Sequence, residues 1–86
     1  MKTYVLTVIG ASRVTLSVEG ADAPFWTLDF AGTLTSVGAA KEAIRFLQNR
    51  GEALTKRGLE LTGFRATELV WTYRIVTEPL AQVVAV

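Results

Sequence analysis

The chain contains no histidine and no cysteine among its 86 residues. Histidine is the only side chain whose ordinary pKa lets it exchange protons near neutral pH, and it is the commonest metal ligand. Cysteine would supply a thiolate nucleophile, a soft metal ligand or a disulfide. The two absences exclude thiol chemistry, disulfide bridges and the usual zinc sites. We therefore expect no cofactor and no metal.

Long apolar runs are also missing. No apolar segment approaches the roughly 20 residues that a helix needs to cross a bilayer. The apolar start of the chain, residues 1–11, is short for a signal peptide and is interrupted by Thr3 and Thr7. Because cysteine is absent as well, the sequence predicts a cytoplasmic protein that does not contact a membrane.

Apolar side chains are abundant, at 50% of the residues, against 20% that are charged. A chain of this length forms a single domain, here residues 1–86, and such a domain buries only roughly 60–65% of the surface of its unfolded chain. One small core cannot hide all of the apolar content. The composition thus predicts an exposed apolar surface for a partner or for self-association.

Charge is distributed unevenly along the chain, although the formal net charge is only +1. Residues 41–65 carry a net +3, and the segments on either side carry −1 each. This excess is far weaker than the basic stripe of a dedicated DNA-binding protein. We predict that a partner is contacted by basic residues of this middle segment, namely Arg45, Arg50, Lys56, Arg57 and Arg65.

Three early segments have the composition and spacing of strands. Residues 3–9 are β-branched and aromatic, and residues 13–19 and 25–31 alternate between apolar and polar side chains. Short turns separate them, which predicts an antiparallel meander. One face would carry Val14, Leu16, Val18, Trp26, Leu28 and Phe30. The other face would be rich in threonine and serine, with the apolar members Val5, Ile9 and Phe25.

The spacing changes to that of a helix after Gly32. Thr35 or Ser36 offers an N-cap oxygen, and Gly51 suits the left-handed position that ends a helix. A further helical turn at residues 52–57 is a weaker expectation. The apolar stripe of the helix consists of Val37, Ala40, Ile44 and Leu47, with Ala43 beside it and Phe46 off it.

The last third of the chain returns to strand patterns. Residues 59–64 suit a short strand and residues 68–77 a long one, which Pro79 ends. Either the face with Trp71 and Tyr73 or the face with Val70 and Val76 can be covered. Residues 80–86 are apolar and β-prone, which suits an additional strand or a tail that contacts a partner.

This order of elements, β-β-β-α-β(-β), predicts an α+β fold. One amphipathic helix covers one face of an antiparallel sheet of four to five strands.

The patterns that would carry chemistry are weak. The segment from Gly32 to Lys41 differs from a P-loop, because five residues separate its glycines and Lys41 stands three residues after the second. Lys41 and Lys56 would need a desolvated pocket to act as nucleophiles. The carboxylates lie mostly at turns, without a pattern that would bring a pair together. We predict that the protein is not an enzyme.

Nucleic-acid binding is an alternative. Phe25 with Arg13, Arg65 and Arg74 can form a sheet surface where bases stack and phosphates are neutralised. The aromatic signature of the RNA-recognition motif is absent. This alternative is a nucleic-acid-binding domain that uses a basic, threonine-rich sheet face.

We predict a small non-enzymatic protein that occupies the surface of a larger protein or nucleoprotein complex. In size, lack of catalytic residue types and strand–helix order the chain resembles the small inhibitors carried by phages and mobile elements, such as anti-CRISPR proteins. That resemblance implies inhibition of host defence by occupancy. Weak contact with nucleic acid and a homodimer are compatible with this function. A second alternative is a structural, self-assembling subunit.

Overall fold

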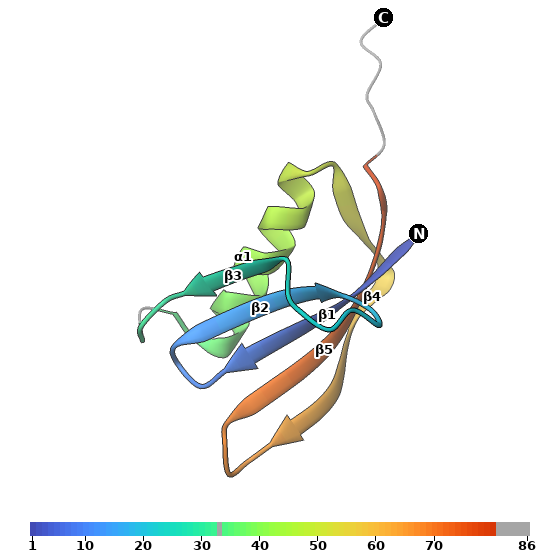
Figure 1. Cartoon of the computed structure of the whole chain (residues 1–86). Helices are drawn as coiled ribbons and strands as arrows, with labels where there is room; N and C mark the ends of the chain where they lie inside the picture. Colours follow the sequence, from blue (N-terminus) through green and yellow to red (C-terminus); the bar gives the residue numbers. More distant parts are fainter. Residues whose placement is uncertain (33, 81–86) are drawn as a thin grey trace, which may run out of the picture.

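The computed structural model of the chain describes residues 1–32 and 34–80. Its elements follow the order β1 (Lys2–Ile9), β2 (Arg13–Val18), β3 (Trp26–Asp29), α1 (Ser36–Asn49), β4 (Glu52–Arg65) and β5 (Val70–Pro79). In this part of the chain the strands form one antiparallel sheet in the order β3-β2-β1-β5-β4. The helix α1 lies across one face of the sheet (Figure 1). The predicted α+β fold is confirmed.

The strand registers decide which apolar side chains face the helix. Leu6 pairs with Leu16 on one side and with Tyr73 on the other, while Val8 pairs with Val14 and Trp71. Residues paired directly across an antiparallel ladder point to the same face. Tyr73 and Trp71 therefore share the helix side with the core, and Val70 and Val76 point to the other face.

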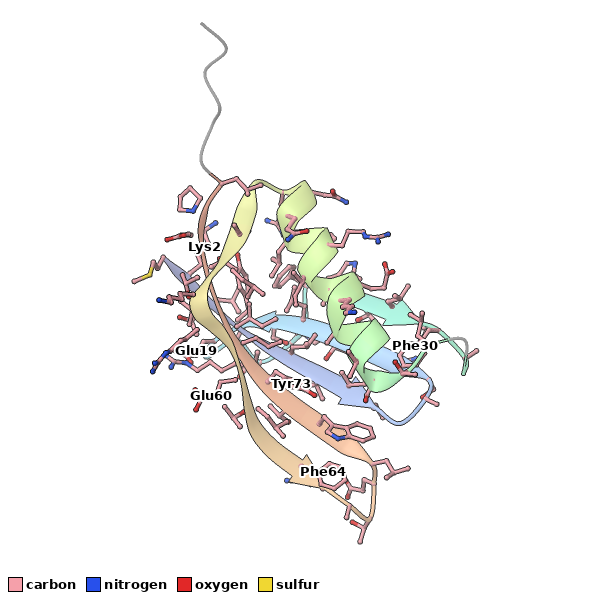
Figure 2. All side chains as sticks on the ribbon, turned by 180° about the vertical axis from the view of Figure 1, so that it is seen from behind. Lys2, Glu19, Phe30, Glu60, Phe64 and Tyr73 are labelled. Atoms are coloured by element: carbon pink, nitrogen blue, oxygen red, sulfur yellow. The ribbon has the colours of Figure 1, made fainter. Side chains whose placement is uncertain are left out.

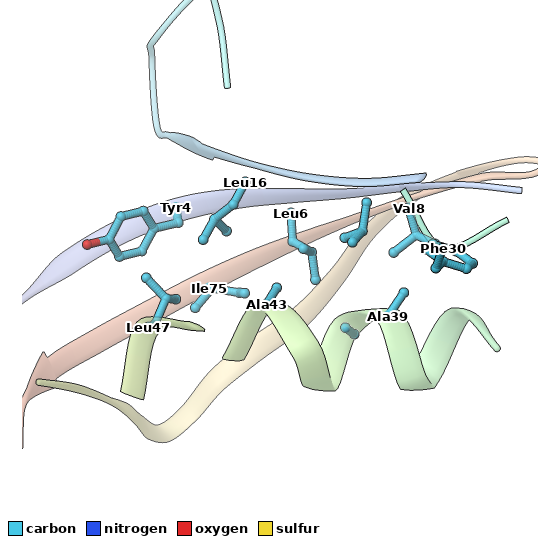
Figure 3. Packing of buried hydrophobic residues seen from close by; sticks show 11 residues of the cluster. Tyr4, Leu6, Val8, Leu16, Phe30, Ala39, Ala43, Leu47 and Ile75 are labelled. Atoms are coloured by element: carbon cyan, nitrogen blue, oxygen red, sulfur yellow. The ribbon is translucent and has the colours of Figure 1, made fainter. Parts of the chain in front are cut away.

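The core lies between α1 and the central strands (Figure 3). Small residues on the helix, Ala39 and Ala43, let its backbone approach the sheet closely, and both are fully buried. Tyr4 stands at one end of this row of side chains and Phe30 at the other. The buried apolar side chains are Tyr4, Leu6, Val8, Val14, Leu16, Phe30, Ala39, Ala40, Ala43, Leu47 and Ile75.

The predicted ends of the helix are confirmed. The side chain of Thr35 accepts a hydrogen bond from the Gly38 N–H at 3.0 Å, which is the N-cap interaction. Gly51 has a φ of +83°, the left-handed conformation that glycine adopts without strain. One member of the predicted stripe differs, since Val37 in the first turn is 58% exposed.

Phe25 lies on the helix side, so its prediction for the opposite face was wrong. It precedes β3, which begins at Trp26, and its side chain is therefore not bound by the alternation of that strand. Its ring lies 5.7 Å from that of Tyr4 and 6.2 Å from that of Phe46, between ring centroids. Phe46, off the predicted stripe, also stacks on Trp26 at 5.1 Å.

The predicted helical turn at residues 52–57 was wrong as well, because β4 is one long bent strand. Its pairing with β5 is interrupted between Leu54 and Leu59 and again between Leu61 and Gly63. Such bulges break the period of two that identifies a strand in a sequence. Gly58 lies in the first bulge, where an added Cβ would collide with the Val76 carbonyl oxygen.

The chain end was expected to be an additional strand or a tail that contacts a partner. The Leu80 N–H donates to the Gly51 carbonyl at 2.8 Å, just after β5 ends. Residues 81–86 of that expectation lie outside the described residues.

Candidate binding surfaces

Exposed apolar side chains gather on the outer part of the β4–β5 hairpin. Leu59 pairs with Ile75, Leu61 with Tyr73, and Phe64 with Trp71, so these side chains belong to the helix side of the sheet. Leu59, Leu61 and Phe64 are 42%, 53% and 50% exposed. We call this surface the hairpin patch, which consists of Leu59, Leu61, Phe64, Trp71 and Tyr73.

The β4 members of the hairpin patch are open because the helix does not reach them, whereas Trp71 and Tyr73 also pack against the core. α1 packs against β1, β2 and β4, whose early residue Leu54 borders the core. The hairpin projects past the helix in Figure 1, and Figure 2 shows Phe64 near its tip, with Tyr73 closer to the helix. The Phe64 and Trp71 rings pack at 5.2 Å, and Leu69 in the adjoining turn is 51% exposed.

The opposite face of the sheet carries Val70 and Val76 beside its polar residues, and two of its arginines pair with carboxylates. The Arg13 Nε lies 2.7 Å from a carboxylate oxygen of Asp29, and the Arg74 Nε lies 3.4 Å from one of Glu19. Phe25, which was to supply an aromatic ring to this face, is on the other side. A phosphate backbone would have to compete with these carboxylates, which weakens the support for the nucleic-acid alternative.

The five basic residues predicted to contact a partner do not form one patch. Arg45 lies on α1, with its Nη1 3.9 Å from a Glu42 oxygen. Lys56 and Arg57 are exposed within the bend of β4, between the first and second of its three paired parts. Arg65 ends β4, and its Nη1 lies 3.7 Å from a Glu68 oxygen. Arg50 caps the C-terminus of α1 and is the member that lines a pocket.

A buried carboxylate that the sequence did not single out lies beside that pocket. Glu52, 8% exposed, accepts a hydrogen bond from the Tyr4 hydroxyl at 2.5 Å and another from the Thr77 hydroxyl at 2.9 Å. Buried charges require such partners. The only sequence signal for this role is the position of Glu52 immediately after the helix-ending glycine.

The electrostatics keep this cluster in one protonation state at neutral pH. Burial and then the Glu52 hydrogen bond raise the pKa of Tyr4 to about 12. Burial works to raise the pKa of Glu52, but the hydrogen bonds from Tyr4 and Thr77 and the charges of Lys2 and Arg50 lower it below its ordinary value. Glu52 is therefore an ionised carboxylate, and the Tyr4 hydroxyl keeps its proton and donates a hydrogen bond to it. The Tyr4 and Thr77 hydroxyls thus both donate to a group inside the fold.

The Arg50 side chain is held between two aromatic rings. Its guanidinium carbon lies 5.4 Å from the centroid of Phe25 and 5.5 Å from that of Phe46, at distances typical of cation–π contacts. Arg50 borders a hollow of about 650 Å³, which we call the Arg50 pocket. The lining residues are Lys2, Thr3, Tyr4, Val18, Phe25 and Arg50.

Val18 was predicted for the covered face, and it is on that side of the sheet but 51% exposed. It ends β2 next to the Arg50 pocket, where it forms part of the wall.

Over residues 1–32 and 34–80, no group of three or more acidic side chains lies close enough to hold a metal ion. Within the same ranges, no helix has both the length and the hydropathy to span a membrane. Comparison with family models, with curated proteins and with solved structures finds no match to this chain.

Proposed function

We propose that the protein is a non-enzymatic binding protein that docks its β4–β5 hairpin into an apolar groove of a larger protein or nucleoprotein complex. The observation that carries this proposal is the hairpin patch, three of whose members are 42–53% exposed on a paired, two-stranded support. Contiguous apolar patches of ~300–600 Å² on small proteins are often functional. Aromatic side chains such as Phe64 and Trp71 are typical anchors of protein interfaces.

The shape of the hairpin favours a groove over a flat partner surface. Stable interfaces bury about 800 Å² on each partner, more than five partly exposed side chains supply. A groove would also contact the β4 edge and Leu69 in the turn, which is 51% exposed. The patch itself carries no charged side chain, so an apolar partner surface suits it better than a phosphate backbone.

Within this class we propose occupancy as the mechanism and the cytoplasm as the location. The narrower identity, an inhibitor of host defence of the anti-CRISPR type, is supported by small size and by the lack of histidine and cysteine.

The experiment compares capture of a partner by the natural chain and by two variants, from a lysate of the native host treated with nuclease. The first variant, Leu61→Ser with Phe64→Ser, removes the apolar centre of the hairpin patch. The matched control, Val37→Ser, changes a residue on α1 that is 58% exposed. Any protein that is retained is then purified and its affinity for each chain is measured directly.

We expect the natural chain and the control to bind one purified partner equally, and the double variant to bind it at least tenfold more weakly. Equal binding by all three chains would contradict the proposal. A parallel capture omits the nuclease, and a partner retained only in that untreated lysate would favour the nucleic-acid alternative. Assembly of the pure natural chain into multimers through the same residues would favour the self-assembling subunit.

A further inference from the structure

The Arg50 side chain is held in place, yet in the part of the chain that the structure describes its guanidinium donates no hydrogen bond. The backbone N–H of Arg50 caps α1 by donating to Leu47 and Gln48, and its guanidinium lies against the Phe25 and Phe46 rings. Within residues 1–32 and 34–80 the guanidinium makes no hydrogen bond or ion pair, although its charge acts on Glu52. A guanidinium fixed by stacking loses less freedom on binding a ligand than one that moves freely.

The Arg50 pocket joins this cation to a second cation and to an apolar wall. Its volume of about 650 Å³ lies within the range of ~300–1,000 Å³ that is usual for sites of small ligands. Lys2 contributes an ammonium group from the start of β1, and Phe25 and Val18 contribute apolar surface that is 40% and 51% exposed. Figure 2 shows Lys2 at the opposite end of the sheet from Phe64, so the pocket is separate from the hairpin patch.

The charge of the pocket is positive. Two carboxylates lie nearby, those of Glu52 and Glu78, and Glu52 already accepts hydrogen bonds from Tyr4 and Thr77. Both carboxylates line a neighbouring hollow of about 290 Å³ instead of the Arg50 pocket itself. The lining of the Arg50 pocket contains two cations and no acidic side chain. A carboxylate or a phosphate presents two oxygens side by side, and these can accept the two parallel N–H bonds of an arginine side chain.

We propose that the Arg50 pocket binds a small organic anion. Its carboxylate or phosphate contacts Arg50 and Lys2, and its aromatic body lies against Phe25 and Val18. This inference goes beyond the proposed function, because it concerns a different surface and a different class of ligand. Carboxylate and phosphate share the chemistry that the pocket recognises, and the test separates them.

The test uses two sets of probes, measured by calorimetry and by the NMR shifts of backbone amides. The phosphate set is adenosine monophosphate with its two parts, adenosine and ribose phosphate. The carboxylate set is indoleacetate with its two parts, indole and acetate. In at least one set we expect the whole anion to bind at least tenfold more tightly than either part, with the largest shifts at Thr3, Phe25 and Arg50.

Three variants decide whether Arg50 is responsible. Arg50→Met keeps apolar contact with the two rings and removes the charge, so we expect affinity to fall about tenfold or more. Lys2→Met at the exposed start of β1 should weaken binding in the same direction. Arg45→Met removes an arginine of the same helix that does not line the pocket, and should leave affinity unchanged.

Two results would overturn the proposal. One is that neither whole anion binds more tightly than its parts. The other is that Arg45→Met weakens binding as much as Arg50→Met, which would show attraction to general positive charge. The Leu61→Ser, Phe64→Ser variant should bind the anion normally, so failure of the hairpin proposal and failure of this one are distinguishable.

Discussion

Two regions of the same sheet face differ sharply in what covers them. Leu6 on β1 is fully buried under α1, whereas Leu61 on β4 is 53% exposed, although both pair with Tyr73 in neighbouring ladders. The alternation of side chains gives both leucines the same orientation. The difference comes from the reach of the helix. The covered region stabilises the fold, and the open region leaves apolar surface for a partner.

The largest difference in stability is expected when one leucine is truncated in each region. Leu6→Ala removes fully buried methyl groups and leaves a cavity, so we expect a loss of about 2–5 kcal/mol in the free energy of unfolding. Leu61→Ala should change it by less than about 1 kcal/mol because the side chain is half exposed. Denaturant unfolding of both variants measures the two values. Similar losses would show that the hairpin patch also belongs to the core.

A second prediction concerns the buried hydrogen bond from Tyr4 on β1 to Glu52, the first residue of β4. Tyr4→Phe removes one of the two hydroxyl donors to Glu52, so we expect a loss of about 1.5–3 kcal/mol, since the acceptor is a buried carboxylate. Tyr73→Phe is the matched control, because the Tyr73 side chain is only partly buried. Calorimetric unfolding distinguishes them, and an equal small loss in both would contradict the role of Glu52.

The same cluster predicts a pH dependence. The folded pKa of Glu52 is lowered, so its contribution to stability is present above the ordinary glutamate pKa and is lost as the pH falls through the folded value. The folded pKa of Tyr4 is raised to about 12. Its contribution to stability is therefore present below the ordinary tyrosine pKa and is lost as the pH rises through the folded pKa. Unfolding curves from acid to alkaline pH should show both losses, and Glu52→Gln should remove the acid one.

The bend of β4 gives a fourth prediction, again with an internal control. In Gly58→Ala the new methyl group would collide with the Val76 carbonyl and lie 2.9 Å from the Thr55 backbone nitrogen, so we expect a loss of about 1–3 kcal/mol. In Gly63→Ala the nearest atom, the Thr72 Cβ, is 3.9 Å away, which is ordinary contact. Thermal unfolding of the two variants should therefore give unequal midpoints, and equal ones would contradict the described bend.

The smallest expected effect on stability is that of an ion pair on the sheet face opposite α1. The Arg13–Asp29 pair has side chains that are 53% and 66% exposed, and exposed pairs contribute at most about 1 kcal/mol. A double-mutant cycle with Arg13→Gln and Asp29→Asn measures the coupling. A coupling energy well above this value would show that the Arg13–Asp29 pair stabilises the fold more than an exposed ion pair does.

Much of the fold could be predicted from local patterns. The strand alternation, the helical stripe and the helix ends at Thr35 and Gly51 each depend on neighbouring residues, and they were confirmed except at Phe25 and Val37. Whether Trp71 and Tyr73 faced the helix could not be decided locally, because it depends on the register between β1 and β5. The course of β4 was missed because two bulges interrupt its alternation.

The candidate surfaces were less accessible to prediction. An apolar excess indicated that some exposed patch exists, but its place depends on where α1 stops covering the sheet. Arg50 was among the predicted contact residues because of its charge alone. What separates it from Arg45 is contact with Phe25 and Phe46, which only the folded chain brings together.

The central claim is that the hairpin patch binds a partner without holding the fold together. The most direct measurement compares the Leu61→Ser, Phe64→Ser variant with the natural chain, in both the free energy of unfolding and the affinity for the captured partner. We predict a smaller loss of unfolding free energy than for Leu6→Ala, because both side chains are half exposed, together with at least a tenfold loss of affinity. Retained affinity, or a loss of stability like that expected for Leu6→Ala, would contradict the claim.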